Sequence, residues 1–180
     1  MDFFPSKMLT RSQRCKIVKT NPVDINFHKE ENCDNKWLQD EFIQAYFDSL
    51  YNHTRKIRED ILFIGPTVTQ LLKCGSSLDI QYALESLGFK KTNVIFFCIS
   101  DHSHSIDQPG GSHWSLLVFS RSDKMFFHLD SCSGLNNMHA KEVAKRVSPD
   151  YSFTEIKTLQ QTSNFECGLH VLVKLNIFWT

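Results

Sequence analysis

The chain has 180 residues, of which 41% are hydrophobic and 22% are charged, a composition typical of folded globular proteins and not of disordered ones. Its 20 basic and 20 acidic residues balance, so no global field draws it to nucleic acid or to an anionic membrane surface. No apolar run approaches the roughly 20 residues that cross a bilayer. We expect one compact, monomeric domain without a nucleic-acid or membrane partner.

The first residues lack the continuous apolar segment of a secretory signal, so we expect a cytoplasmic or nuclear protein. Residues 1–35 are interpreted as a flexible tail and residues 36–180 as the folded domain. The alternative for the tail is a targeting segment, because it carries a basic stretch formed by Lys7, Arg11, Arg14, Lys16 and Lys19. The six cysteines include no CxxC pair, which argues against a zinc ribbon and a thioredoxin-type redox site.

The first half of the domain is predicted to be mostly helical. Apolar residues recur every four positions over 37–50, which predicts an amphipathic helix. A short apolar run at 61–64 precedes a helix over 66–72, whose first residue is a proline that suits a first turn. Residues 78–87 predict a further helix, stopped by the glycine that follows.

The middle of the domain is predicted to form strands. Residues 93–99 (NVIFFCI) are typical of a central strand, and residues 100–112 form a polar, glycine-bearing loop. The runs 114–119 (WSLLVF) and 125–129 (MFFHL) are separated by four polar residues at 120–123. We therefore expect these two runs to pair as an antiparallel hairpin.

The last third is predicted to hold a helix at 139–147, a strand at 153–156 and a helix at 166–178. The final helix is almost unbroken in its apolar character and must be buried. Helices, then strands, then helices again indicate an α+β domain.

The predicted hairpin brings a histidine beside an aspartate. With a loop at 120–123, Phe119 faces Lys124 and His113 lies opposite Asp130. Cβ atoms of such a pair are roughly 4.5–5.5 Å apart on one face of the sheet, so the carboxylate can hold the imidazole by a hydrogen bond. His113 is a candidate general base and Asp130 its orienting residue. The alternative is two solvated or capping side chains, and a one-residue slip in register would separate them.

Cys167 opens the apolar helix after the polar segment 160–166, which places it at a helix amino terminus. The positive end of the helix dipole, together with an imidazolium, favours the thiolate that attacks carbonyl groups. Gly168 allows close backbone approach and leaves room for a substrate. Gln161 is a candidate donor to the oxyanion. The remaining cysteines are interpreted as small buried hydrophobic residues, namely Cys15, Cys33, Cys74, Cys98 and Cys132.

Four parts of the chain together resemble the ubiquitin-like protease family, the clan CE cysteine proteases that process small ubiquitin-like modifiers. They are GGSHWSLL (110–117), FHLDS (127–131), Gln161 and FECG (165–168). The resemblance implies a papain-like or adenain-like α+β fold with a central mixed sheet flanked by helices, and no cofactor or metal. It also implies a catalytic triad of His113, Asp130 and Cys167, with Gln161 as the oxyanion residue.

The runs GGSHWSLLVF, FFHLDS and MHAKEVAKRV look like the deneddylase branch of that family. This implies cleavage after the Gly-Gly carboxyl terminus of a ubiquitin-like modifier, with the neddylation modifier favoured, in precursors and in conjugates such as modified cullins. Trp37 and Trp114 are then expected to flank a channel for the tail, since glycine alone passes between two indoles without a Cβ clash. The alternative for both is core packing. Asp40 is expected to contact the residues leading into the tail.

The chain departs from the family pattern at several points. Gln39 replaces the usual asparagine, Glu166 replaces the commoner aspartate, and the segment from Asp130 to Cys167 is shorter. Thirteen residues follow Cys167, where family members continue with further helices, so we expect a fold truncated at its carboxyl end. The apolar side chains expected to lose their cover are Leu169, Leu172 and Val173.

Two other functions stay open. A family member that binds a modifier but cuts weakly or not at all would differ from an enzyme in thiol reactivity. A metal-binding protein would respond to a metal titration, and its candidate ligands are His102, His104, His113, His128, Cys98 and Cys132.

Overall fold

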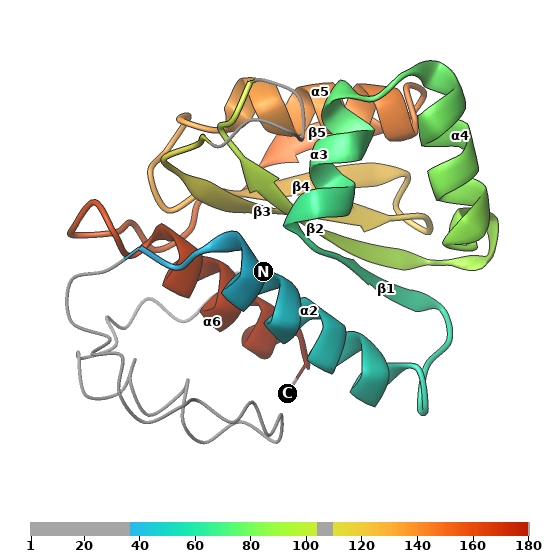
Figure 1. The fold of residues 1–180 in the computed structure, drawn as a ribbon, viewed down its shortest axis with the longest axis horizontal. Coiled ribbons are helices and arrows are strands. Elements are labelled where there is room, and N and C mark those ends of the chain that lie inside the picture. Colours follow the sequence, from blue (N-terminus) through green and yellow to red (C-terminus); the bar gives the residue numbers. More distant parts are fainter. Residues whose placement is uncertain (1–36, 104–109, 180) are drawn as a thin grey trace.

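The computed structural model describes residues 37–103 and 110–179, and its centre is a five-stranded mixed sheet (Figure 1). The strands lie in chain order, with β1 parallel to β2, β4 parallel to β5, and β2, β3 and β4 antiparallel. They are β1 (Ile61–Ile64), β2 (Val94–Ser100), β3 (Trp114–Ser120), β4 (Met125–Leu129) and β5 (Ser152–Glu155). Outside the described residues lie the predicted tail with its basic stretch, Cys15, Cys33 and His104.

Helices cover both faces of the sheet (Figure 1). On one face lie α2 (Asp40–Thr54) and α6 (Cys167–Trp179). On the other lie α3 (Pro66–Cys74), α4 (Ser77–Ser86) and α5 (Asn137–Val147), and a short 3-10 turn at Phe89–Lys91 leads into β2. Every helix and strand predicted from the sequence is present with small shifts at its ends. The predicted α+β fold with a central mixed sheet is therefore confirmed.

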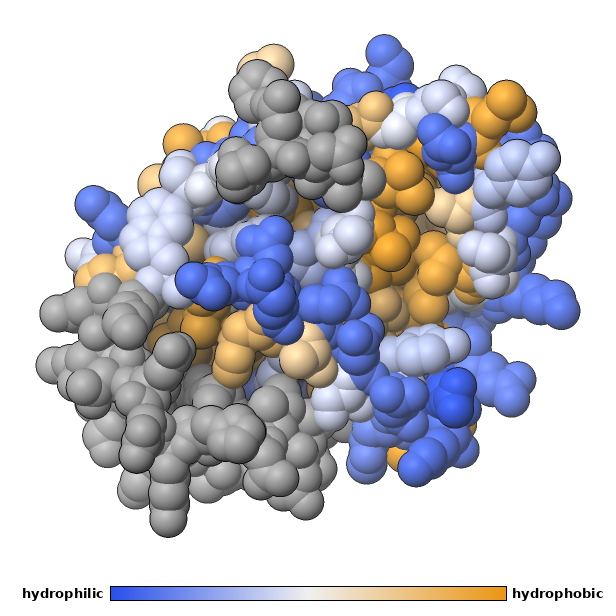
Figure 2. Space-filling view, in the orientation of Figure 1, coloured by the Kyte–Doolittle hydropathy of each residue, from blue (hydrophilic) through white to orange (hydrophobic). Residues whose placement is uncertain are grey.

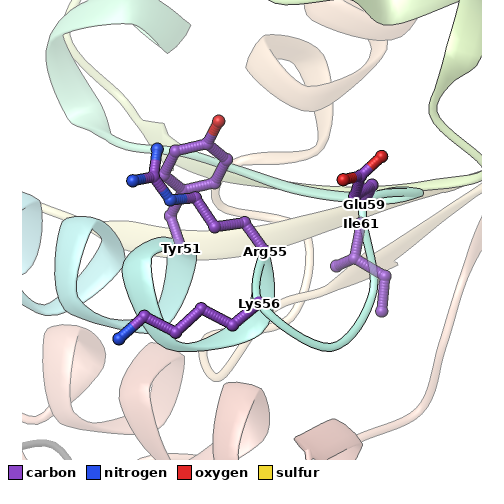
Figure 3. A pocket seen from close by; sticks show the side chains of 5 residues that line it. All are labelled: Tyr51, Arg55, Lys56, Glu59 and Ile61. Atoms are coloured by element: carbon purple, nitrogen blue, oxygen red, sulfur yellow. The ribbon is translucent and has the colours of Figure 1, made fainter.

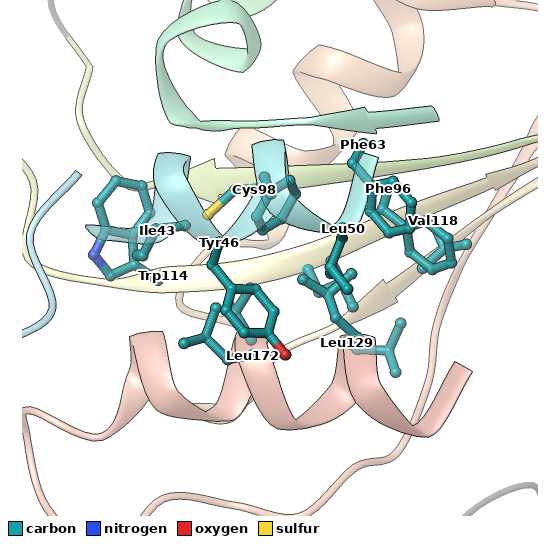
Figure 4. Packing of buried hydrophobic residues seen from close by; sticks show 14 of the residues in the cluster. Ile43, Tyr46, Leu50, Phe63, Phe96, Cys98, Trp114, Val118, Leu129 and Leu172 are labelled. Carbon is teal, nitrogen blue, oxygen red and sulfur yellow. The ribbon is translucent and has the colours of Figure 1, made fainter. Parts of the chain in front are cut away.

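Each face of the sheet has its own apolar core. Along β3, Leu116 and Val118 point toward α2 and α6, whereas Leu117 and Phe119 point toward the helices of the opposite face, because successive side chains of a strand alternate. Figure 4 shows the first core, in which Tyr46 of α2 lies among side chains of the sheet and of α6. The strands that position the candidate site are thus fixed from both sides.

The β3–β4 hairpin is antiparallel as predicted, but its four-residue loop lies one residue later along the chain, which shifts each cross-strand partner by two residues. Phe119 pairs with Phe126 and Ser120 with Met125, so the expected pairs of Phe119 with Lys124 and of His113 with Asp130 are wrong. A shift of two residues leaves every side chain on its predicted face, because side-chain direction repeats every second residue. His113 and Asp130 consequently still meet, just outside the paired part of the strands.

The carboxyl-terminal helix is better covered than the sequence suggested. Leu172 is 1% exposed within the core of Figure 4, which contradicts its expected exposure, and Leu169 and Val173 are half-buried. Among the described side chains of α6, the exposed large apolar ones are Ile177 and Phe178. On the face drawn in Figure 2, apolar side chains emerge beside α4, and Leu78 of that helix is exposed. Within the described residues, no helix is long and apolar enough to span a membrane.

Candidate active site

A histidine and an aspartate form a close buried pair at one end of the sheet. His113 precedes β3 and Asp130 follows β4, and His113 Nε2 lies 2.6 Å from Asp130 Oδ1. The two residues are only 3% and 6% exposed. The carboxylate also accepts backbone N–H groups of Cys132 and Asn136, each at 3.0 Å. Its position is therefore fixed from three directions.

The pair is charged at neutral pH. Burial by itself lowers the pKa of His113, but hydrogen bonds to Asp130 and Cys167 outweigh it and raise that pKa from 6.5 to about 9. Burial also opposes ionisation of Asp130, yet hydrogen bonds from His113 and from the amides of Asn136 and Cys132 hold its pKa below the usual value. An imidazolium beside a carboxylate follows.

Cys167 is the first residue of α6 and is 1% exposed. Its interaction with His113 helps to raise the pKa of the imidazole. Because Nε2 of that ring is held by Asp130, Nδ1 is the nitrogen left for the thiol. The first N–H groups of a helix have no partner within the helix, so they are available beside the sulfur. The structure thus brings together the three residues predicted to form a triad.

Asp101, a residue that the sequence analysis did not single out, fixes the backbone of His113. Its carboxylate accepts the N–H of His113 at 3.0 Å, and also the N–H and the hydroxyl of Ser112. Gly111 adopts φ 96 and lies so close that an added Cβ would be 2.6 Å from Ser100 Oγ. This close approach requires glycine. It brings Asp101 next to the loop that contains His113.

Asn136 is a second residue that the sequence did not reveal. It is fully buried, and its Nδ2 donates to the carbonyl of His113 at 3.3 Å and to Ser115 Oγ at 3.1 Å. Its own N–H donates to Asp130. One amide therefore holds both members of the histidine–aspartate pair. Side-chain contacts between residues more than 20 positions apart leave no periodic signal in a sequence.

Gln161 lies in the loop before α6, joined to the loop after β4. Its N–H donates to the Ser131 carbonyl at 2.8 Å, and its side-chain oxygen accepts from Ser131 Oγ at 2.9 Å. Its Nε2 donates to the carbonyl of Ser163 at 2.9 Å, which leaves one N–H of the amide for another acceptor. Glu166 stabilises the same loop, because its carboxylate accepts from the N–H groups of Thr162 and Ser163.

The residues predicted to bind substrate lie in different surroundings. Trp114 is 7% exposed and belongs to the core, and its Nε1 donates to the carbonyl of Leu38 at 3.1 Å. Trp37 is 43% exposed, and Asp40 is exposed at the start of α2. The space beside Gly168, expected for a substrate, is occupied by Leu38, whose Cβ lies 2.9 Å from the position of an added Cβ. Trp114 and Gly168 thus both contact the segment that leads into α2.

One surface hollow lies away from these residues. A shallow pocket between the end of α2 and the start of β1 is lined by Tyr51, Arg55, Lys56, Glu59 and Ile61 (Figure 3). None of the predicted catalytic residues lines it, so it is not part of the candidate site. Among the described residues, no three His, Cys, Asp or Glu side chains are grouped as metal ligands.

Comparison with known proteins identifies the family. Residues 36–180 match the model of the Ulp1 protease family, C-terminal catalytic domain. The chain belongs to this family of cysteine proteases. Sentrin-specific protease 8 of Homo sapiens is 35% identical over 145 residues, covering 76% of this chain and 68% of that protein.

Two further proteins are similar to this chain. NEDD8-specific protease 1 of Arabidopsis thaliana is 28% identical over 148 residues, covering 78% of this chain and 65% of that protein. The structure of the Xanthomonas campestris effector XopD bound to ubiquitin is similar with a TM-score of 0.65 at 25% identity, covering 86% of this chain and 80% of that one. The chain therefore spans about two thirds of the length of the curated proteases, and the predicted resemblance to ubiquitin-like proteases is confirmed.

Proposed function

We propose that this Ulp1-family chain is a deneddylase: a cysteine protease that cleaves after the Gly-Gly carboxyl terminus of the neddylation modifier, in precursors and in conjugates. The arrangement of His113, Asp130 and Cys167 at the start of α6 carries the proposal. The modifier is favoured by the names of the relatives, which are NEDD8-specific or sentrin-specific proteases.

In the proposed reaction the thiol proton already resides on His113, and the thiolate Sγ of Cys167 attacks the carbonyl carbon of the last glycine. The carbonyl oxygen becomes an oxyanion, stabilised by the free N–H of the Gln161 amide and by N–H groups at the amino terminus of α6. The C–N bond then breaks, and His113 returns the proton to the leaving amine. Water hydrolyses the thioester with His113 again as the base, and Asp130 holds the ring in one orientation throughout.

The buried position of Cys167 suits a substrate with a very thin tail. A chain that reaches Sγ must pass the segment around Leu38, which contacts both Trp114 and the start of α6. Two glycines have no Cβ to clash there. We propose that Trp114 and the exposed Trp37 flank this path and that Asp40 contacts the residues before the Gly-Gly tail.

The setting of the enzyme is part of the same proposal. We expect residues 36–180 to act as a monomeric catalytic domain in the cytoplasm or nucleus, with cullins among the conjugates that it trims. Gel filtration with light scattering tests the monomer, and release of free modifier from neddylated cullin tests the conjugate.

The decisive experiment uses modifiers that carry a carboxyl-terminal electrophile. The neddylation probe should label Cys167, whereas SUMO and ubiquitin probes should react at least about tenfold more slowly. Cys167→Ser should abolish labelling and turnover while leaving modifier binding intact, because a hydroxyl is a far poorer nucleophile at neutral pH. Binding without labelling of the wild-type chain would instead identify a modifier-binding protein that does not cut. Faster labelling by the SUMO probe would overturn the proposed substrate.

A further inference from the structure

A buried lysine lies on the catalytic helix, seven residues after the cysteine. Lys174 is 4% exposed, and its Nζ donates to the carbonyl oxygen of Leu129 at 3.5 Å. Leu129 is the last residue of β4 and directly precedes Asp130. The lysine therefore spans the gap between the helix that carries Cys167 and the strand end that carries Asp130.

The position is an unfavourable one for an ammonium group. No salt bridge joins Lys174 to any carboxylate of the described residues, and a buried cation with a single long hydrogen bond is poorly compensated. An unbranched apolar side chain of similar length would fill the same space without that penalty. Packing alone therefore does not explain why a charged residue stands within the apolar face of α6.

The charge is nevertheless present at neutral pH. Burial lowers the pKa of Lys174 to about 8, with the negative charges of Asp130 and Cys167 acting in the opposite direction. At pH 7 most molecules thus carry a positive charge behind the proposed catalytic residues. Its field also reaches His128, where it helps to keep that imidazole neutral.

We propose that Lys174 is a positioning residue for catalysis: it ties the end of β4 to α6 and supplies positive charge that favours the Asp130 carboxylate and the Cys167 thiolate. The proposal rests on the proposed role of Cys167 as the nucleophile. The hydrogen bond to Leu129 carries the positional part. The burial of the ammonium beside the residue that precedes Asp130 carries the electrostatic part, and the coupling to Asp130 and Cys167 agrees with it.

The effect on pH dependence follows from the groups around the lysine. Lys174 is coupled to Asp130, Cys167 and His128. The other buried titratable groups on its helix, in the core that this helix covers and in the triad are His170, Tyr46, Cys98 and His113. Loss of the Lys174 charge removes an interaction that favours the negative charges of Asp130 and Cys167, so the acidic limb of the activity profile should move to higher pH. On the basic limb His113 loses its proton near pH 9, where Lys174 is already largely neutral. That limb should move little.

The test compares Lys174→Met and Lys174→Gln with Lys145→Met, which removes an exposed lysine of α5. We expect both Lys174 variants to lose about 10- to 100-fold in kcat/KM at pH 6 to 7 and to shift the acidic limb upward by roughly 0.5–1 pH unit. Lys174→Met should melt at the same temperature as the wild type or higher, because a buried charge is replaced by an apolar chain. Lys145→Met should change none of these quantities.

Two outcomes would overturn the proposal. One is a Lys174→Met enzyme with unchanged activity and pH profile. The other is a lower melting temperature with an unmoved acidic limb, which would make the lysine structural. Alkylation of Cys167 by iodoacetamide, followed by mass spectrometry across pH, measures the same limb without any modifier. If the alkylation rate of the wild-type chain shows the acidic limb but the chain cleaves no modifier, the proposed function alone is refuted. If the acidic limb of the alkylation rate is the same in the wild type and in Lys174→Met, the role of Lys174 is refuted.

Discussion

Two histidines of one hairpin, one at the end of the sheet and one inside it, are both buried and yet differ in charge. His113 is 3% exposed and lies 2.6 Å from a carboxylate oxygen of Asp130. His128 is 1% exposed, and its Nε2 lies 2.9 Å from the hydroxyl of Ser115. Its Nδ1 has no hydrogen-bond partner among the described residues, and Glu155 is 3.9 Å away at the solvent edge.

The difference shows that the nearest partner, rather than burial, sets the charge. Burial lowers the pKa of both rings. At His128 it prevails and brings the pKa to about 4, whereas at His113 the hydrogen bonds to Asp130 and Cys167 bring it to about 9. A neutral ring inside the sheet serves packing, and a charged ring at its end is suited to hold a thiolate.

Replacing each histidine in turn should give the largest difference between the two regions, in activity for His113 and in stability for His128. His113→Ala should lower kcat/KM by about 10³–10⁴-fold, because the proton carrier is removed. His128→Ala should change kcat/KM less than about tenfold while lowering the free energy of unfolding by roughly 1–3 kcal/mol through lost packing and the lost hydrogen bond with Ser115. Steady-state kinetics and urea unfolding measure both. If the two variants lost kcat/KM to a similar extent, the assignment of His113 to catalysis and of His128 to packing would be wrong.

Removing the carboxylate should make the surroundings of His113 resemble those of His128. Asp130→Asn keeps the shape of the site but removes the charge, so the pKa of His113 should fall well below 9 and kcat/KM should drop by about 10²–10³-fold. A titration of the His113 ring by NMR checks the pKa. A ring that still titrates near pH 9 in this variant would mean that Cys167 rather than Asp130 sets its charge.

The hairpin illustrates what the sequence could and could not predict. The strands, their antiparallel pairing and the meeting of His113 with Asp130 were predicted, because alternation of side chains survives a register shift of two residues. The register itself depends on the turn at 121–124, where Lys124 adopts φ 52 without any glycine to signal it. Periodicity carries no information about such a turn.

The supporting residues escaped prediction for a different reason. Asp101 and Asn136 act through hydrogen bonds to backbone groups that the fold brings close, and such contacts have no fixed spacing in the chain. Lys174 did have a signal, a lone charge within the apolar run of the last helix, but its contact with β4 appears only in three dimensions. The direction of the Gln161 amide likewise depends on Ser131 and Ser163.

The two histidines should also give opposite pH dependences of stability. The pKa of His113 is raised from 6.5 to about 9, so its contribution is fully present below pH 6.5 and is lost as pH rises to about 9. The pKa of His128 is lowered from 6.5 to about 4, so its contribution is present above pH 6.5 and is lost as pH falls to about 4. Each amounts to at most about 3 kcal/mol.

Urea unfolding from about pH 4 to about pH 10 measures these contributions. His113→Ala should remove the decline of stability on the alkaline side, and His128→Ala should remove the decline on the acidic side. Each of the two variants serves as the control for the other. If both variants kept the wild-type dependence on both sides, other groups would control stability and the assigned charges would be wrong.

The smallest effect is expected at Asp101, which fixes the backbone of His113 but touches neither its ring nor the sulfur. Asp101→Asn keeps an oxygen that can accept the N–H of His113, but it loses the charge that strengthens this bond and those from Ser112. We expect kcat to fall about 3- to 30-fold with little change in KM, since the ring is displaced slightly and substrate binding is not. Ser112→Ala, which removes only the hydroxyl contact, is the matched control and should lose less than about threefold. If Asp101→Asn lost no more kcat than Ser112→Ala, the contribution of Asp101 would come from its hydrogen bond with the Ser112 hydroxyl and not from its hydrogen bond with the His113 N–H. Asp130 and Asn136 alone would then hold the charged histidine in position.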